Sequence, residues 1–384
     1  MDYFSSNFKL GLLGGGQLGK MLLSETRKFD IYTKVLDPSN EAPCKISANE
    51  FIQGDLMDYE TVYNFGKDID LLTVEIENIN IEALKQLELE GLKVYPQPVV
   101  LETIRNKGRQ KQFYDINDIP NAPFTVYNSL TDLKEAINSK IVSLPFVWKS
   151  TEFGYDGTGV KIVRNSEDLA SLTDVECIAE TLVDFENELA VIVSRNSQGD
   201  IKTYPVVEME FHPEANQVEY VICPARISDD IANKAQETAE KVAKAYNHVG
   251  LLAVEMFQTK TDEILVNEVA PRPHNSGHYS IEASYTSQFE QHIRAILNLP
   301  LGSTESKAPG IMVNLVGSEN HNGEVFYENI DKILNLKGVT PHIYGKKTTR
   351  PFRKMGHVTI VNENIQTARE IAKEVKETIN VISK

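Results

Sequence analysis

Two glutamates in the second half of the chain, Glu255 and Glu268, have a spacing that suits metal chemistry. They lie in the apolar runs 251–257 and 264–270, which flank a short polar segment and are typical of a β-hairpin. A turn centred between positions 261 and 262 would pair the two glutamates on one face, with Cβ atoms roughly 5 Å apart. Like charges so placed destabilise a hairpin, whereas a shared divalent cation removes the repulsion. The pair therefore predicts a magnesium site that also contacts substrate phosphates.

Polar residues gather directly around the second glutamate. Asn267 precedes Glu268, and Arg272, His274 and Asn275 follow within seven positions. A bound cation with phosphate and anion ligands explains why such groups end an apolar strand. The alternative is a pair of solvated glutamates on an exposed strand, and a register slip of one residue would place the two carboxylates on opposite faces.

A glycine-rich loop is the second candidate for phosphate chemistry. The predicted strand 144–149 ends in Lys149, and the loop 150–159 leads into another predicted strand, 160–163. Such a loop between antiparallel strands can fold over phosphates as a flap, with the lysine as a point charge aimed at them. Lys149 as an ordinary solvated strand-end residue is the alternative.

The N-terminal segment contains a glycine turn between a predicted strand, 9–13, and a predicted helix. Its spacing, Gly14-x-Gly16-x-x-Gly19, matches the dinucleotide fingerprint, in which helix amides bind a phosphate. Asp37 could be the acidic residue that such a site requires. Equally, the glycines could serve only to pack helix against strand.

Further candidate ligand contacts follow the predicted strand 71–74. Glu75 and Glu77 come directly after it, and open parallel sheets bind ligands outside the carboxyl ends of their strands. Helix-capping or solvated carboxylates are the alternative for these two residues.

The densest basic cluster of the chain lies at 344–357. Lys346, Arg353 and Lys354 could clamp a phosphate monoester, because bidentate arginine and point-charge lysine suit that group. A solvated loop is the simpler interpretation.

The elements that must position these residues divide the chain into three predicted domains. Alternating strands and helices indicate a Rossmann-like α/β domain at 1–103. A predicted helix over 99–114 leads into a central domain at 104–300, which contains the flap and the hairpin. The Pro- and Gly-containing segment 300–309 is typical of a linker and lies at the start of a small α/β domain at 301–384.

Composition limits the class of protein. The chain has 384 residues and a formal net charge of −16, which argues against nucleic acid or an anionic membrane as the main partner. It has neither an apolar run near the ~18 residues that span a bilayer nor a secretory signal. Three isolated cysteines favour a reducing cytoplasm.

Taken together, the motifs resemble the ATP-grasp superfamily, and within it the family of 5-(carboxyamino)imidazole ribonucleotide synthases. The resemblance is carried by GGGQLG at 14–19, FGYDGTG at 153–159, NEVAPRPHNSGH at 267–278 and RKMGH at 353–357, and it extends essentially end to end. It implies an α/β and α+β fold with a Rossmann-like pre-ATP-grasp domain, an ATP-grasp domain and a small C-terminal domain. It also implies a cytoplasmic homodimer that carboxylates 5-aminoimidazole ribonucleotide with bicarbonate, using ATP and magnesium, through carboxyphosphate.

The resemblance also implies roles for individual residues. Magnesium would be held by Glu255 and Glu268, and bicarbonate by Arg272, His274 and Asn275. Beyond the resemblance, the position of Asp156 in the glycine-rich loop leads to the hypothesis that it orients or deprotonates the amine of the nucleotide. The expected ATP contacts are Lys107, Lys149, Gly154, Tyr155, Asp156, Gly157, Thr158, Gly159, Glu180, Thr181, Leu182, Val183, Glu188, His212, Asn267 and Glu268. The expected contacts to the ribonucleotide are Gln17, Glu75 or Glu77, Tyr155, Asp156, Lys346, Arg353 and Lys354.

Three positions depart from the family pattern. Thr158 stands where Arg or Lys is usual, Lys107 stands where Arg is usual, and Phe352 replaces a glycine before RKMGH. None of them is an expected metal ligand, so we expect activity to survive, with altered nucleotide affinity.

Three other functions remain open from sequence. A formate-dependent glycinamide ribonucleotide transformylase would share the architecture. A nicotinamide-dependent oxidoreductase would use the glycine turn at 14–19 but leaves the hairpin and the flap unexplained. A nucleotide sensor without turnover would not need the carboxylate pair.

Overall fold

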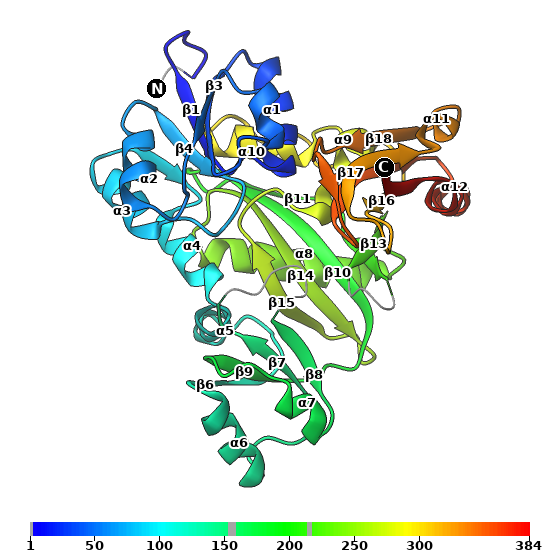
Figure 1. The fold of residues 1–384 in the computed structure, drawn as a ribbon. Helices are drawn as coiled ribbons and strands as arrows, with labels where there is room; N and C mark the ends of the chain where they lie inside the picture. The colour runs from blue at the N-terminus through cyan, green and yellow to red at the C-terminus, as the bar shows by residue number, and fades with distance from the viewer. Residues whose placement is uncertain (1–2, 153–158, 213–216) are drawn as a thin grey trace.

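The N-terminal domain is a parallel sheet with helices on its faces. The computed structural model describes residues 3–152, 159–212 and 217–384 (Figure 1). The strand order β3-β2-β1-β4-β5 is that of a doubly wound fold, as predicted. The strands are β1 (Lys9–Leu13), β2 (Tyr32–Asp37), β3 (Glu50–Gln53), β4 (Leu71–Val74) and β5 (Lys93–Tyr95); the helices are α1 (Gln17–Lys28), η1 (Pro43–Ile46), α2 (Tyr59–Gly66) and α3 (Ile81–Leu89).

Two helices, not one, connect this domain to the next. The prediction of a single helix over 99–114 is wrong, because the helix is interrupted at Asn106, between α4 (Pro98–Arg105) and α5 (Lys107–Ile116). Asn106 has extended backbone angles, and its side chain accepts a hydrogen bond from the Arg109 amide at 2.9 Å, so it caps α5. The break sets the direction of α5 independently of α4.

A small sheet with strand order β6-β9-β7-β8 follows α5 and forms the lobe at the bottom of Figure 1. Its hydrophobic core is built around Leu133, Phe146 and Trp148. Its elements are β6 (Phe124–Tyr127), α6 (Leu130–Asn138), β7 (Phe146–Ser150), β8 (Val160–Val163), α7 (Ser166–Ala170) and β9 (Cys177–Thr181).

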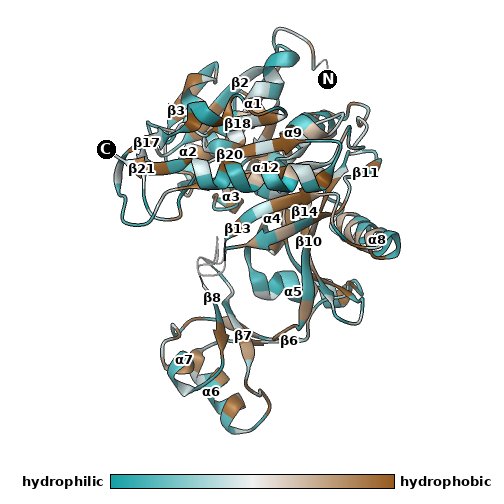
Figure 2. Ribbon diagram, turned by 90° about the vertical axis from the view of Figure 1, so that its right-hand side faces the viewer, coloured by the Kyte–Doolittle hydropathy of each residue, from teal (hydrophilic) through white to brown (hydrophobic). Residues whose placement is uncertain are grey.

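A large antiparallel sheet, β15-β14-β10-β12-β13-β16-β20-β18, forms the centre of the molecule, and β11 pairs with β10. Helix α8 packs its apolar face against β10 and β14, which carry many of the brown, hydrophobic residues in Figure 2. The central elements are β10 (Phe185–Arg195), β11 (Ile201–Thr203), β12 (Val207–Phe211), β13 (Val218–Cys223), α8 (Asp229–Ala245), β14 (Gly250–Thr259), β15 (Ile264–Ala270), η2 (Asn275–Gly277), α9 (Ser280–Ala283) and α10 (Gln288–Ile296).

The C-terminal domain continues this large sheet. Strand β16 pairs with β13, so the sheet crosses the predicted boundary without a break. The segment 300–309 is packed and is no solvated linker: Thr304 donates to the Thr203 carbonyl at 2.7 Å, and the Gly302 amide donates to Gln291 at 2.8 Å. The remaining elements are β16 (Gly310–Val316), β17 (Gly323–Glu328), α11 (Ile330–Ile333), β18 (Val339–Ile343), β19 (Thr348–Thr349), β20 (Lys354–Val361), α12 (Ile365–Thr378) and β21 (Asn380–Ser383).

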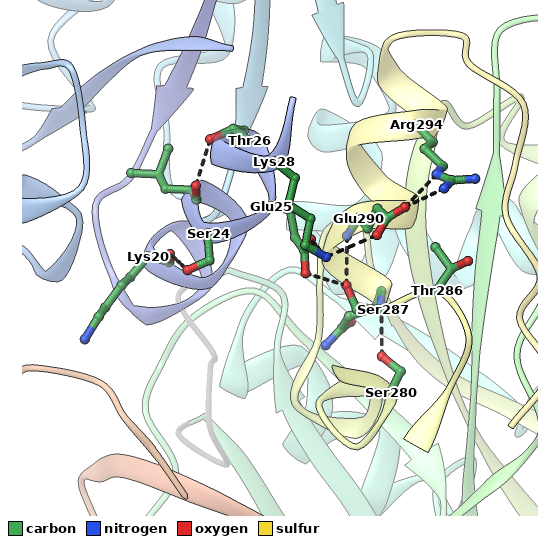
Figure 3. A network of polar contacts seen from close by, with 12 residues as sticks. Lys20, Ser24, Glu25, Thr26, Lys28, Ser280, Thr286, Ser287, Glu290 and Arg294 are labelled. Atoms are coloured by element: carbon green, nitrogen blue, oxygen red, sulfur yellow. Dashed lines mark hydrogen bonds and ion pairs between the residues drawn. The ribbon is translucent and has the colours of Figure 1, made fainter. Parts of the chain in front are cut away.

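The N-terminal domain docks on α10 through its helix α1 (Figure 3). Ser287 donates to the buried Glu25 carboxylate at 2.9 Å, and Lys28 lies between Glu25 at 2.5 Å and Glu290 at 3.3 Å. Phe289 and its apolar neighbours on α10 enter the hydrophobic cluster that contains β1 and α1. The contact is therefore partly apolar and partly ionic.

We expect Phe289→Ala to lower the free energy of unfolding by about 3–5 kcal/mol, because the substitution leaves a cavity in a closely packed cluster. Phe289 is 1% exposed, whereas Phe4, which serves as the control, is 60% exposed. Urea unfolding monitored by circular dichroism should show little change for Phe4→Ala. Equal midpoints for Phe289→Ala and the wild type would contradict this account of the interface.

No described helix combines the length and apolar character that crossing a bilayer requires.

Candidate active site

The predicted glutamate pair is present, and a β-bulge makes it. Glu255 lies opposite Glu268 on the β14–β15 hairpin, as predicted. Nearer the turn, however, Met256 pairs with Val266, so the ladder is shifted by one residue and Asn267 is the extra residue of a bulge. A regular ladder from the observed turn would have paired Glu255 with Asn267. The bulge therefore restores the carboxylate pair and re-aims the neighbouring side chains, as bulges beside active sites do.

A third carboxylate lies on the same face of the sheet. Ala190 of β10 pairs with Glu255, so Glu188, two residues away, is a diagonal neighbour of Glu255. Burial, then the charges of Glu268 and Glu188, raise the pKa of Glu255 to about 8. Burial and Glu268 likewise raise the pKa of Glu188 to about 7. These carboxylates repel one another unless a cation lies among them.

Lys107 compensates one of these charges. It is the first residue of α5, and its ammonium forms a hydrogen-bonded ion pair with Glu268. The charge of Lys107 lowers the pKa of Glu268 to about 2 against the effect of burial, so Glu268 is ionised. The start of α5, fixed by the Asn106 cap, therefore places a cation beside the carboxylate pair.

The donor set fits magnesium that arrives with a phosphate substrate. Among the residues that the structure describes, no three His, Cys, Asp or Glu side chains are grouped so as to hold a metal ion by themselves. Mg²⁺ is commonly bound by one or two carboxylates, with substrate phosphates and water completing the octahedron. Glu255 and Glu268 supply that number of carboxylates.

Lys149 belongs to the same cluster from the opposite sheet. Its ammonium donates to Asn267 Oδ1 at 2.9 Å and lies 2.6 Å from Glu180 Oε2. Glu180 is 3% exposed, so its side chain is turned into the protein, while Thr181 is exposed and Leu182 and Val183 are half-buried. The alternative, that Lys149 is an ordinary solvated strand-end residue, is thereby excluded.

The segment after β15 places an arginine and a histidine beside the carboxylates of this cluster. Arg272 forms an ion pair with Glu77 at 2.8 Å, and His274 Nε2 lies 3.3 Å from Glu255 Oε1. The Gln288 side chain accepts from the His274 amide at 2.9 Å and donates to the His274 carbonyl at 2.8 Å. The backbone at His274 is therefore held in place by helix α10.

Asn275 pairs its side-chain amide with that of Asn314 on β16. Two reciprocal hydrogen bonds, each 2.9 Å, join the two amides, and both residues are buried. Asn314 also donates to the Val218 carbonyl at 2.8 Å. This pair ties the segment after β15 to the C-terminal part of the large sheet.

The glycine turn at 14–19 is occupied by the protein's own carboxylates. The Gly15 amide donates to Asp37 at 2.7 Å, and the Gly16 amide donates to Glu75 at 2.7 Å. Gly14 has a φ of +93°, which a residue with a Cβ rarely adopts. The amides that would bind a dinucleotide phosphate are therefore already engaged, which favours the packing interpretation of this motif.

Glu75 and Glu77 thus differ in their surroundings. Burial raises the pKa of Glu75 to about 7, although Arg272 and the Gly16 amide oppose the shift. Glu77 instead contacts Arg272 directly. Both carboxylates lie at the carboxyl end of β4, facing the segment after β15.

The basic loop reaches this region from the C-terminal domain. Lys346 donates to the Lys354 carbonyl at 2.7 Å, and Arg353 donates to the Thr348 carbonyl at 2.6 Å. Lys20 of α1 donates to the Ile343 carbonyl at 2.9 Å, so the helix that begins at Gln17 contacts the end of β18, from which this loop starts. The charge of Lys354 acts on Glu255.

The remaining expected ATP contacts are His212 and the loop residues 154–159. His212 lies at the end of β12, with its ring 5.9 Å from that of Phe352. Gly159 is in the described chain, where its carbonyl accepts from the Ser150 amide at 2.9 Å. Gly154, Tyr155, Asp156, Gly157 and Thr158 lie outside the described residues.

Sequence reasoning assigned no role to several residues that the structure brings into this network. Lys111, Gln288 and Asn314 all contact expected site residues. The spacing of Lys111, four residues after Lys107, places both lysines on one helix face and could have indicated it. Gln288 and Asn314 carry no comparable local signal.

Comparison with known protein families gives a match in each of the three parts of the chain. Family models match a ribonucleotide synthetase preATP-grasp domain at 8–105, an ATP-grasp domain at 112–289 and a phosphoribosylaminoimidazole carboxylase C-terminal domain at 310–371. The N5-carboxyaminoimidazole ribonucleotide synthase of Bacillus subtilis is 38% identical over 358 residues, which cover 92% of this chain and 91% of the relative.

Solved structures agree with the sequence comparison. The N5-carboxyaminoimidazole ribonucleotide synthetase of Thermotoga maritima has a TM-score of 0.90 and 43% identity, covering 98% of this chain and 100% of that one. A synthase from Aspergillus clavatus in complex with ADP and 5-aminoimidazole ribonucleotide has a TM-score of 0.87 and 34% identity, covering 97% and 98%.

The amide pair yields a stability prediction. We expect Asn275→Ala and Asn314→Ala each to lower the free energy of unfolding by about 1–3 kcal/mol, because each leaves a buried amide unsatisfied. The double variant should cost little more than the worse single variant, since it removes both partners. Urea unfolding of all four proteins measures the coupling, and additive losses would show that the two amides act independently.

Proposed function

The chain belongs to the N5-carboxyaminoimidazole ribonucleotide synthase family of ATP-grasp ligases, also called 5-(carboxyamino)imidazole ribonucleotide synthases, and we propose that it carboxylates 5-aminoimidazole ribonucleotide for purine biosynthesis. ATP phosphorylates bicarbonate to carboxyphosphate and leaves as ADP. The exocyclic amine then attacks the carboxyl carbon, phosphate departs and the amine loses a proton. The observation that carries the proposal is the Glu255–Glu268 pair between Lys107 and Lys149.

The ATP site in this proposal lies between the small and the large sheet. Lys107 and Lys149 bind the phosphates, and Glu180 to Val183, Glu188, His212 and Asn267 surround the nucleotide. Glu255 and Glu268 would hold magnesium, which would neutralise charge on the phosphates. The pairing of the two carboxylates and the burial of Lys149 and Glu180 support these roles.

Bicarbonate and carboxyphosphate are assigned to Arg272, His274 and Asn275. Arginine offers a planar fork of donors that matches a carboxylate or a phosphate. The hydrogen bonds from Gln288 to the His274 backbone fix that residue before substrate arrives, so little reorganisation is needed on binding.

The ribonucleotide is assigned to the space where the N-terminal and C-terminal domains meet. Gln17 and Glu75 or Glu77 come from the N-terminal domain, and Lys346, Arg353 and Lys354 would hold the 5′-phosphate. The contact of Lys20 with the Ile343 carbonyl supports this juxtaposition. Tyr155 and Asp156 of the flap would complete the site.

The flap at 153–159 is assigned to water exclusion, because carboxyphosphate hydrolyses readily in water. We further propose that the protein acts as a homodimer in the cytoplasm. The buried free thiols of Cys44, Cys177 and Cys223 are compatible with a reducing compartment.

Release of ADP by the purified protein tests the proposal. With ATP, magnesium and bicarbonate, we expect a strong rise when 5-aminoimidazole ribonucleotide is added. Glu268→Gln should lower that rate roughly 100-fold or more, because preorganised charge stabilisation is lost. Glu263→Gln, exposed at the hairpin turn, is the control and should keep the wild-type rate. Stimulation only by formate with glycinamide ribonucleotide would instead assign a transformylase.

The flap carboxylate has its own prediction. If Asp156 orients or deprotonates the amine, Asp156→Asn should lower kcat roughly 100-fold or more, as the loss of a general base does. Binding of ATP should change much less. Near-normal turnover by Asp156→Asn in the ADP-release assay would exclude this role.

A further inference from the structure

Lys111 is a buried lysine to which the proposed reaction assigns no role. It lies one helical turn after Lys107 on α5, and it is 2% exposed. Its ammonium forms a hydrogen-bonded ion pair with Glu180 Oε1 and lies 3.5 Å from Asn121 Oδ1. Burying an ammonium is costly unless it is paired, so its position calls for a reason beyond packing.

Glu180 is shared between two lysines. Lys111 donates a hydrogen bond to Oε1, and Lys149 forms an ion pair with Oε2 at 2.6 Å. Lys149 also donates a hydrogen bond to Asn267 Oδ1, at 2.9 Å. Lys111 therefore holds Glu180 in place, and Lys149 remains oriented toward the bulge that carries Asn267 and Glu268.

The charges of this cluster do not cancel. Two ammonium groups surround one carboxylate, and all three side chains are at most one-tenth exposed. Without Lys111, Glu180 and Lys149 would form a neutral buried pair. In a site with little water, the attraction within such a pair is strong. Glu180 would then compete with any other anion for Lys149.

We propose that Lys111 is a positioning residue for ATP, which holds Glu180 and keeps a surplus positive charge in the Lys111–Glu180–Lys149 cluster. Lys149 can then offer its charge to the phosphates of ATP instead of being neutralised by Glu180. The inference rests on the proposed function, because it requires the phosphates to lie beside Lys149. It assigns Lys111 an effect on nucleotide affinity without direct contact with the nucleotide.

The test compares Lys111→Met with Lys34→Met. Methionine keeps the length of the side chain and removes the charge. Lys34 is a matched control, because it is 4% exposed, forms ion pairs with Asp68 and Glu50, and lies on β2 away from the cluster. Binding of a non-hydrolysable ATP analogue with magnesium is measured by calorimetry, and KM and kcat are measured by ADP release.

Lys111→Met should weaken analogue binding and raise KM for ATP about tenfold or more, with kcat and KM for the ribonucleotide much less changed. Lys34→Met should lower thermal stability but bind the analogue like the wild type. Unchanged analogue affinity in Lys111→Met would overturn the inference. A wild-type protein that binds no analogue would instead overturn the proposed function.

A charge-restoring double variant separates charge from packing. In Lys111→Met with Glu180→Gln, the cluster again carries one net positive charge, which now lies on Lys149 alone. The double variant should therefore bind the analogue more tightly than Lys111→Met alone. If it binds equally or more weakly, loss of packing around α5 explains the effect, and the charge-sharing role is wrong.

Discussion

The repulsion between Glu255 and Glu268 is the constraint on which the arrangement of this site depends. A hairpin that places two carboxylates face to face, with Glu188 diagonal to Glu255, is unfavourable unless cations lie nearby. The chain supplies Lys107 and Lys149 from two other elements. Both ammonium groups must lie beside the same hairpin residues, Asn267 and Glu268. The start of α5 at Lys107 and the end of β7 near Lys149 are therefore constrained. Local features such as the Asn106 cap therefore have consequences for the phosphate binding that we propose for Lys107 and Lys149.

The continuity of the large sheet explains how distant parts of the chain converge. Strand β16 extends the sheet beyond β13, so the C-terminal domain is positioned by backbone hydrogen bonds. The amide pair of Asn275 and Asn314 then joins the segment after β15 to that extension. The N-terminal domain is docked by α1 against α10, whose first residue, Gln288, fixes His274. A shift of any domain would therefore move residues assigned to bicarbonate or to the ribonucleotide.

Much of the fold could be predicted from the sequence, because apolar periodicity and turn residues act locally. The predicted strands 9–13 and 71–74 and the Rossmann-like class of the first domain are confirmed. The pairing of Glu255 with Glu268 was predicted from a regular ladder, but the structure reaches it through a bulge at Asn267. A bulge depends on tertiary context and cannot be predicted from the local pattern. The predicted pair was therefore correct, although the predicted register nearer the turn was wrong by one residue.

Other features could not be predicted, because they depend on residues far apart in the chain. The fingerprint at 14–19 suggested a phosphate site, yet Glu75, nearly 60 positions later, binds its amides. Lys111 lies one helical turn after Lys107, but the sequence does not show that Glu180 and Lys149 lie beside it. The break at Asn106 is different, because an Asn cap is a local feature. It was missed because apolar residues continue with helical spacing on both sides of Asn106.

Phe352 shows how this context can tolerate a departure from the family pattern. Its φ of +59° lies in the left-handed region, where a glycine is unstrained and another residue costs about 1–2 kcal/mol. The conformation is imposed from both sides: the Phe352 amide donates to the Gly317 carbonyl at 2.8 Å, and the Gly317 amide donates to the Arg353 carbonyl at 2.9 Å. A Cβ on Gly317 would lie 2.1 Å from the Arg350 carbonyl oxygen, so only a glycine at position 317 allows the two backbones to approach this closely. The loop that presents Arg353 is thus fixed by its pairing with Gly317, and the backbone keeps a glycine-like shape although the side chain has changed.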